Sequence, residues 1–365
     1  MNSKKGILPF LLSLLLFTAC SNSIHNKNQA VYSPKSDMDI FLFIGQSNMG
    51  GVAPIGVLDT VTLSGVLLFN GRNEWEKAKN NLGIYGGLNR YSTSNIGKKA
   101  QLSPVYTCSR KIAQVTGKSI GVVSNARGGT RISWWQKGYS GENDFDLYEN
   151  AIARAKAALA TKPGSKIKGI FWHQGEGDNS TQASAVYMKE LTSLIADLRK
   201  DLGDNTIPFI AGEVGQWKNR GMGVNPVIRT IKQNIPYTDW VSSKGLTSIN
   251  LPKNDPHFDT YSQRVFGERY ADKALELIYH IKAEGLSLFS ASNYEGRSVL
   301  LRQGNYSNVD LERKGIEVKE IASIRSTKSY KVQFVSSLGK VDEAKGDVPD
   351  LKLPADIVEL RIIKR

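Results

Sequence analysis

The stretch IFLFIGQSNM, residues 40–49, decides the fold because it joins a wholly apolar run to a polar turn that carries a hydroxyl. Residues 40–44 are apolar at every position, which is typical of a parallel strand covered on both faces. Similar short apolar runs follow at residues 120–124, 167–172, 207–211 and 240–242. The sequence therefore predicts a sheet of buried, mostly parallel strands.

Segments with helical periodicity separate these strands. The first begins with Ser103 as a cap and Pro104 in the first turn, and Gly117 ends it. The others are predicted at residues 145–160, 183–202, 224–233 and 261–283. Strands that alternate with helices predict a doubly wound α/β sheet with three layers, of the flavodoxin-like kind.

Such a sheet binds ligands outside the carboxyl ends of its strands, so polar residues that follow strands are expected to meet there. Ser47 follows the first predicted strand, residues 127–129 follow the second, and residues 173–176 follow the third. These sequence-distant segments therefore predict one shared site at a rim of the sheet.

Four motifs occur in a fixed order: GQSNM at residues 45–49, a glycine pair at 128–129, WHQGE at 172–176 and DPH at 255–257. Together they resemble the SGNH hydrolase superfamily, and more narrowly its sialate O-acetylesterase and carbohydrate esterase family 6 (acetylxylan esterase) group. The resemblance covers about residues 37–285. It implies a serine esterase that removes O-acetyl groups from carbohydrate through an acetyl-serine intermediate, without a cofactor. Acetylated sialic acid and acetylated xylan or another hemicellulose are the substrates it implies.

Ser47 is the predicted nucleophile, and His257 is the predicted base because a serine hydroxyl is a poor nucleophile until an imidazole takes its proton. An isolated GQSN also fits a turn or helix-cap serine, but the other motifs favour the nucleophile. The remaining histidines are His25 in a polar tether, His173 at a strand end and His280 near a helix end.

The acidic partner of His257 departs from the family pattern. The resemblance implies an aspartate three residues before the histidine, but Asn254 stands there and Asp255 lies only two residues before. Asp255 is the predicted partner, and a carboxylate from Glu176 or Glu213, or a backbone carbonyl, is the alternative. The displaced aspartate also favours a competing hypothesis, a non-catalytic carbohydrate-binding lipoprotein with a degenerate hydrolase site.

The resemblance implies an oxyanion hole made of the amide of Ser47, the amide of Gly128 or Gly129, and the side chain of Gln174. Glycine lets the backbone approach a substrate closely. A simple tight turn is the alternative for the glycine pair.

Candidate substrate contacts lie in and beside the motifs: Gln46, Asn48, Arg127, Arg131, Trp134, His173 and Glu176. Packing in a small loop core is the alternative for Trp134, and a structural acid at a helix start is the alternative for Glu176. The sequence shows no cluster of His, Cys and carboxylate residues at ligand spacing, so no metal is predicted.

Residues 1–20 are predicted to be a lipoprotein signal peptide. Two lysines precede an apolar run at residues 7–17, which is too short to span a bilayer. The run ends in FTAC, which resembles a bacterial lipobox with Cys20 as the lipidated residue; ordinary secretion is the alternative. Residues 21–36 form a polar tether. We therefore expect an exported bacterial lipoprotein, anchored to a membrane on the periplasmic side or at the cell surface.

The composition narrows the remaining classes of function. The net charge of +14 is dispersed, with no dense basic run, so nucleic-acid binding is not predicted. Lipidation of Cys20 leaves Cys108 as the second cysteine without a partner, and its apolar neighbours at helical spacing predict a small core residue. The predicted partners are an acetylated carbohydrate and, through the lipid, a membrane; no protein partner is predicted.

Residues 286–365 change in character, because short alternating runs replace the long helical periodicity. LFSASNYEGR at 288–297, GNY at 304–306 and IASI at 321–324 resemble a βγ-crystallin Greek-key motif, and a degenerate second copy spans 330–360. The resemblance implies a small all-β domain of two stacked sheets. Calcium binding is not expected, since KE and AS stand where its ligands would be. Stability, spacing and glycan contact remain alternative roles.

Overall fold

The computed structural model describes residues 37–95, 99–140, 145–326 and 329–365. The predicted signal peptide, Cys20 and the tether at 21–36 lie outside these ranges. Within them, no helix has the length and apolar character needed to cross a membrane.

A seven-stranded sheet forms the centre of the larger part of the chain, with the strand order β3-β2-β4-β1-β5-β6-β7. The strands are β1 (Asp39–Gly45), β2 (Val66–Phe69), β3 (Trp75–Lys77), β4 (Ile120–Ala126), β5 (Lys166–His173), β6 (Phe209–Gly212) and β7 (Thr238–Val241). All neighbouring pairs are parallel except β2 with β3. The predicted mostly parallel sheet is confirmed, and its five predicted strands are β1, β4, β5, β6 and β7. The hairpin-like pair β2 and β3 was not predicted.

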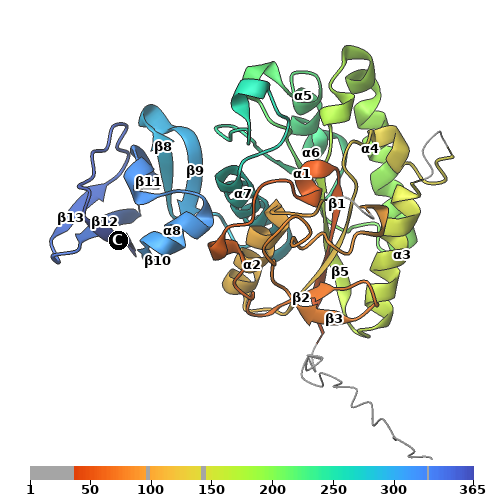
Figure 1. Ribbon diagram of the computed structural model, residues 1–365, viewed down its shortest axis with the longest axis horizontal. Coiled ribbons are helices and arrows are strands. Elements are labelled where there is room, and N and C mark those ends of the chain that lie inside the picture. The colour runs from red at the N-terminus through yellow and green to blue at the C-terminus, as the bar shows by residue number, and fades with distance from the viewer. Residues whose placement is uncertain (1–36, 96–98, 141–144, 327–328) are drawn as a thin grey trace, which may run out of the picture. The chain divides into compact units, whose positions relative to one another are not determined.

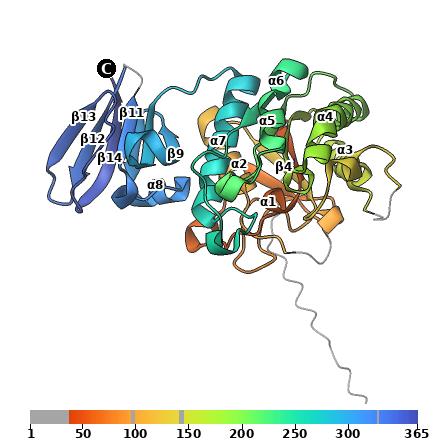
Figure 2. The same ribbon diagram turned by 90° about the horizontal axis from the view of Figure 1, so that it is seen from above.

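Helices cover both faces of this sheet, with α2 and α7 on one face and α3 and α4 on the other (Figures 1 and 2). The helices are α1 (Ser47–Gly50), α2 (Pro104–Thr116), α3 (Leu147–Ala160), α4 (Thr181–Leu202), α5 (Val224–Arg229), α6 (Ile231–Asn234), α7 (Thr260–Tyr279) and α8 (Asn308–Lys314). The helix predicted at 224–233 is interrupted at Thr230, whose hydroxyl donates to the carbonyl of Val227 at 2.8 Å. The helix predicted at 261–283 ends earlier, because His280 adopts a left-handed conformation with φ 55°.

The core explains why β1 is apolar from Ile40 to Ile44. Phe41 and Phe43 pack in the cluster on the α2 and α7 side, whereas Leu42 and Ile44 pack in the cluster on the α3 and α4 side. The Phe43 ring stacks on Phe171 of β5, with 4.6 Å between the ring centroids. Each such side chain contributes about 1.5–3 kcal/mol by leaving water. Burial on both faces therefore fixes β1 in the middle of the sheet.

The strand order places a ligand site beside β1. The order β4-β1-β5-β6-β7 is that of a doubly wound 2-1-3-4-5 sheet, in which the chain reverses direction across the sheet at β1. The register aligns Gly45 with Ala126 of β4 and with His173 of β5, so the segments that follow these strands start side by side. Only glycine fits at Gly45, where φ is +135° and a Cβ atom would lie 2.1 Å from the His173 carbonyl oxygen.

Two antiparallel sheets follow α7, with orders β11-β8-β9 and β10-β14-β12-β13. Their strands are β8 (Leu286–Ala291), β9 (Glu295–Leu301), β10 (Gly304–Ser307), β11 (Ser323–Ser326), β12 (Tyr330–Ser336), β13 (Val341–Lys345) and β14 (Ile357–Lys364). The predicted β character of this segment is confirmed, and the short helix α8 within it was not predicted. Leu288 and Leu311 share one hydrophobic cluster with Phe266 of α7, so the core continues across the predicted boundary at 285. That boundary and the βγ-crystallin likeness stay predictions.

Candidate active site

Ser47 is the first residue of α1, directly after the end of β1. Gln46 is the cap residue in an extended conformation, so the chain turns sharply from strand into helix. The first N–H groups of a helix have no acceptor within the helix, and the Ser47 amide is therefore available to a ligand. The local fold presents a hydroxyl and an amide together at the carboxyl end of β1.

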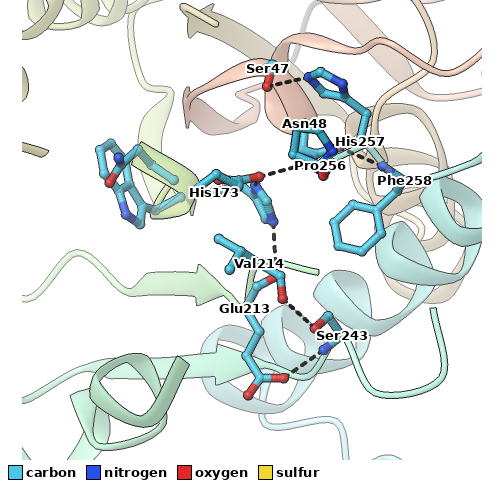
Figure 3. Close-up of polar contacts among 12 residues, drawn as sticks. Ser47, Asn48, His173, Glu213, Val214, Ser243, Pro256, His257 and Phe258 are labelled. Atoms are coloured by element: carbon cyan, nitrogen blue, oxygen red, sulfur yellow. Dashed lines mark hydrogen bonds and ion pairs between the residues drawn. The ribbon is translucent and has the colours of Figure 1, made fainter. Parts of the chain in front are cut away.

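His257 lies within hydrogen-bond distance of Ser47, although 210 residues separate them in the chain (Figure 3). Its Nε2 is 2.9 Å from the Ser47 Oγ, and its Nδ1 is 2.7 Å from Oδ1 of Asp255. An ionised carboxylate can only accept, so Nδ1 carries the ring hydrogen and Nε2 is left to accept the serine proton. The predicted Ser47, His257 and Asp255 thus form one connected chain of contacts.

The turn before His257 explains how Asp255 reaches the ring from two residues away. A short 3-10 helix, η6 (Leu251–Lys253), ends at Asn254, which takes a left-handed conformation with φ 53°. The carbonyl of Asp255 accepts from Ser248 Oγ at 2.8 Å and from Trp217 Nε1 at 2.9 Å. Its Oδ1 also accepts from the backbone N–H of His257 at 2.9 Å. These contacts fix the carboxylate against the imidazole despite its shifted position.

The alternative carboxylates have other partners. Glu213 is fully buried; one of its oxygens pairs with Arg229 at 2.5 Å, and the other accepts from the amide of Ser243 at 2.9 Å. Glu176 accepts from Asn48 at 2.6 Å. Neither carboxylate contacts His257, so the structure favours Asp255 over both.

The Asn48 side chain forms hydrogen bonds with the backbone of the residues on both sides of His257 (Figure 3). Its Nδ2 donates to the Pro256 carbonyl at 3.1 Å and to Oε1 of Glu176 at 2.6 Å, and its Oδ1 accepts from the Phe258 amide at 3.1 Å. Its side chain is buried, with 1% exposure. Both polar atoms of the side chain bond inside the protein, and the substrate contact by Asn48 stays a prediction that this arrangement does not favour. We call Asn48 and Glu176 the histidine hook.

His173 is also buried behind the site. Its Nε2 donates to the carbonyl of Glu213 at 3.1 Å, and its ring packs edge-on against Phe258 and Phe266. Burial lowers the pKa of His173, so the ring is neutral. Its Nδ1 lies 3.8 Å from Oε1 of Glu176. The burial of His173 does not favour its predicted substrate contact, which stays a prediction, and the ring lies beside Glu176 of the hook.

The side chain of Gln174 is directed into the interior, and its role in the oxyanion hole stays a prediction. Its side chain is fully buried, and its Nε2 donates to the carbonyl of Thr130 at 2.9 Å and to Oδ2 of Asp178 at 2.5 Å. Both amide hydrogens are used, so none is left for a substrate oxygen. Asp178, in the 3-10 helix η4 (Glu176–Asp178), also accepts from the amide of Ile132 at 3.0 Å. This internal link between two loops was not predicted.

The two glycines, Gly128 and Gly129, have different surroundings. A Cβ atom on Gly128 would lie 3.3 Å from the Cβ of Ser47, whereas one on Gly129 would meet no atom within 4 Å. Gly129 has φ +74°, as a tight turn requires. The backbone at Gly128 therefore lies directly against the nucleophile, and Gly129 supplies the turn that places it there.

The other predicted contacts differ in their accessibility. Gln46 is 4% exposed, and Arg127 donates to the Ser94 carbonyl at 2.9 Å while its guanidinium lies over the ring of Phe145. Trp134 is half-buried and packs against Phe145 at a tilt. Arg131 is exposed, and Arg127 and Trp134 are partly exposed, so Arg131 is the most open of these side chains to a ligand. In the described part of the chain, no three His, Cys, Asp or Glu residues are grouped to hold a metal ion.

Comparison with known proteins agrees with this fold. Residues 37–276 match the family described as carbohydrate esterase, sialic acid-specific acetylesterase. The chain belongs to this family of SGNH-type carbohydrate esterases.

Two relatives and two solved structures illustrate the similarity. The "Probable carbohydrate esterase At4g34215" of Arabidopsis thaliana is 25% identical over 65% of this chain and 90% of its own length. The "Probable 9-O-acetyl-N-acetylneuraminic acid deacetylase" of Escherichia coli K12 is 29% identical over 35% of this chain and 43% of its own length. The crystal structure of the Arabidopsis protein has a TM-score of 0.56 at 24% identity, covering 66% of this chain and 98% of that one. The crystal structure of NanS has a TM-score of 0.51 at 18% identity, covering 67% and 99%. These two likenesses concern the fold alone.

Proposed function

We propose that this chain is a serine esterase that removes O-acetyl groups from carbohydrate. The observation that carries the proposal is the continuous contact from Asp255 through His257 to Ser47. The family supports the carbohydrate acetyl ester as the bond that is cleaved. The displaced aspartate was the reason for considering a non-catalytic carbohydrate-binding lipoprotein, and the 2.7 Å contact of Asp255 with His257 supports the catalytic alternative.

The first half of the reaction transfers the acetyl group to the enzyme. His257 Nε2 takes the proton of Ser47 Oγ, which attacks the acetyl carbonyl carbon. The amides of Ser47 and Gly128 donate to the oxyanion of the tetrahedral intermediate. The intermediate collapses as the bond to the sugar oxygen breaks, and His257 gives its proton to that oxygen. Asp255 stabilises the imidazolium that forms in between.

Water completes the reaction by the same steps. His257 takes a proton from water, and the resulting hydroxide attacks the carbonyl carbon of the acetyl-serine. The oxyanion again lies at the amides of Ser47 and Gly128. When the ester bond to Ser47 breaks, His257 returns the proton to Oγ, and acetic acid leaves.

A pair of variants tests this mechanism. Ser47→Ala should lower hydrolysis of 4-nitrophenyl acetate by about 10³-fold or more, because no other group provides the attacking oxygen. Ser133→Ala makes the same change at a half-buried serine outside the triad and should keep the rate. Mass spectrometry of acid-quenched enzyme should find the acetyl group on the Ser47 peptide. Equal rates in wild type and Ser47→Ala would remove the serine mechanism.

The substrate is proposed by likeness. Acetylated sialic acid is the first candidate because the family and the Escherichia coli relative are described by that chemistry, and acetylated xylan is the second. Acetate release measured side by side on both substrates distinguishes them. Release from neither, by an enzyme that cleaves 4-nitrophenyl acetate, would direct the search to other acetylated glycans.

The cellular place of the enzyme is proposed from sequence alone. We propose export and lipid anchoring at Cys20, with residues 286–365 as a βγ-crystallin-like domain. Expression of the full chain and of Cys20→Ala should give membrane-bound and released protein respectively. Release of both forms in equal amounts would favour ordinary secretion.

A further inference from the structure

A polar cavity lies away from the proposed catalytic residues, where α2 meets β9, β10 and α8. Its volume is about 380 Å³, which is within the range of small-molecule sites. None of its lining residues belongs to the triad, the histidine hook or the oxyanion site. The cations among them are Arg110, Lys111, Arg302, Arg313 and Lys314.

The acidic residues nearby balance only part of this charge. Glu268 of α7, which is buried, pairs with Arg110 at 3.0 Å, Lys111 at 2.9 Å and Lys314 at 3.3 Å. Burial raises the pKa of Glu268, but these three cations together lower it to about 2. Glu268 therefore stays ionised and holds three cations together with a single negative charge.

The two remaining carboxylates also have fixed partners. Asp272 pairs with Lys111 at 2.9 Å and stands 3.7 Å from Arg302. Asp310 caps α8, where it accepts from the amide and the hydroxyl of Ser307. Five cations therefore face three carboxylates, and the net charge of these residues around the cavity is positive.

Two arginines have buried donors without an acceptor. Nε of Arg302 and Nε of Arg313 are buried and form no hydrogen bond with any residue that the structure describes. Nη2 of Arg302 also forms no hydrogen bond, but it lies 3.7 Å from Oδ1 of Asp272 in an ion pair. The remaining Nη1 of Arg302 donates to the Lys282 carbonyl at 2.9 Å, which anchors the side chain. Buried guanidinium donors without acceptors are costly, so the arrangement is suited to a ligand that supplies acceptors.

The lowered pKa of Lys314 is consistent with the excess of positive charge around the cavity. Burial lowers the pKa of Lys314, Glu268 raises it, and the positive charges of Lys111 and Arg110 lower it further. A negative group in the cavity would relieve this repulsion. Guanidinium groups also bind carboxylate and phosphate in a planar, two-bond geometry that a lysine does not provide.

We propose that this cavity binds a small anion carried by a carboxylate or a phosphate, of the size of an acidic monosaccharide. Arg302 and Arg313 would supply the donors to the anion, while the Glu268 cluster holds the wall in place. The site joins the hydrolase part to the β segment, because α2 lines one side and β9, β10 and α8 line the other. A ligand there would tie these two parts together.

Titration calorimetry of the full-length protein at low salt tests the proposal with four probes: inorganic phosphate, glucuronate, N-acetylneuraminate and neutral glucose. We expect at least one anion to bind with a Kd below about 1 mM and glucose not to bind. Binding of phosphate alone would identify a phosphate site, and binding of the two sugar acids would identify a carboxylate site. Absence of binding by all three anions, or equal binding of glucose, would overturn the proposal.

Three variants locate the binding. Arg302→Gln and Arg313→Gln remove the unpaired donors without touching the partners of Glu268, and each should weaken the anion by about 10-fold or more. Arg325→Gln changes an exposed arginine of β11 that does not line the cavity and should leave the affinity unchanged. Circular dichroism and the Tm show that each variant is folded. Unchanged affinity in folded Arg302→Gln and Arg313→Gln would refute this site even if an anion binds elsewhere.

Discussion

Replacement of Asn48 by alanine should lower activity by displacing His257, while all three groups of the triad remain present. The side chain satisfies the Pro256 carbonyl, the Phe258 amide and one oxygen of Glu176, all at 3.1 Å or less. A buried polar group that loses its partner costs about 1–3 kcal/mol, so the loss of three partners should lower the free energy of unfolding by about 3 kcal/mol or more. Two of these groups flank His257, and its backbone should therefore shift.

The rate should fall with this shift. A displacement of about 1 Å between reacting groups can lower kcat by about 10²-fold. We expect this loss in kcat with little change in KM, because the Asn48 side chain is 1% exposed and its polar atoms bond inside the protein. The assay is 4-nitrophenyl acetate hydrolysis at a temperature well below the Tm of the variant, with unfolding by urea measured on the same preparation.

Asn225→Ala is the matched control. Asn225 is 2% exposed and also bridges backbone groups, donating to the Val214 carbonyl at 3.0 Å and accepting from its amide at 2.9 Å. It should lose comparable stability and keep kcat. Within the hook, Glu176→Gln keeps an acceptor for Asn48 and should retain most activity, whereas Glu176→Ala should not. If folded Asn48→Ala kept kcat within about 3-fold of wild type, the hook would not position His257 and the reasoning from geometry would fail.

Three further outcomes follow from the same contacts. Asp255→Asn should lower kcat by about 10²–10⁴-fold at unchanged Tm, since it weakens the tautomer and the imidazolium that the carboxylate supports; normal activity would show that another group orients His257. Gln174→Ala should lower stability by about 1–3 kcal/mol and change kcat by less than about 3-fold, because its amide hydrogens serve Thr130 and Asp178; a 10²-fold loss of kcat would restore it to the oxyanion hole. Because the folded pKa of Glu268 lies near 2, below its ordinary 4.5, its stabilising effect is present above pH 4.5 and is lost as the pH falls toward 2. Acid unfolding followed by tryptophan fluorescence should show that loss in wild type and a flatter pH dependence in Glu268→Gln; parallel curves would contradict it.

The sheet could be predicted from the sequence because burial on both faces leaves a direct signal. A strand covered on both faces, such as β1, is apolar over a continuous run, here residues 40–44, whereas a strand with one face in water alternates apolar and polar residues. The pair β2 and β3 was missed because each strand is only 3 or 4 residues long, which is too short for a recognisable pattern. β3 is the edge strand of the sheet, and β2 lies between β3 and β4. The contact of Ser47 with His257 was predictable because histidines are few and the two motifs are specific in combination.

The inward direction of the polar side chains could not be predicted. An asparagine or glutamine beside a nucleophile has the same donors and acceptors whether it faces a substrate or a backbone carbonyl. Which one it meets depends on chain segments far away: the Pro256 carbonyl lies 208 residues from Asn48, and the Thr130 carbonyl lies 44 residues from Gln174. The motifs identify the region of the site, and only the tertiary fold assigns each side chain to the substrate or to the support.

The difference between side chains that can meet the substrate and side chains that support the site determines how the site should respond to mutation. Because both amide hydrogens of Gln174 bond inside the protein, we propose backbone amides as the oxyanion donors beside Ser47, and side-chain substitutions leave these in place. The triad itself is partly open, with His257 23% and Asp255 33% exposed, so its geometry depends on the buried hydrogen bonds beneath it. Loss of rate should therefore concentrate in two groups of residues, the three triad members and the buried hook. Exposed side chains such as Arg131 should instead act on the choice of sugar, because they can meet the substrate without holding the catalytic groups.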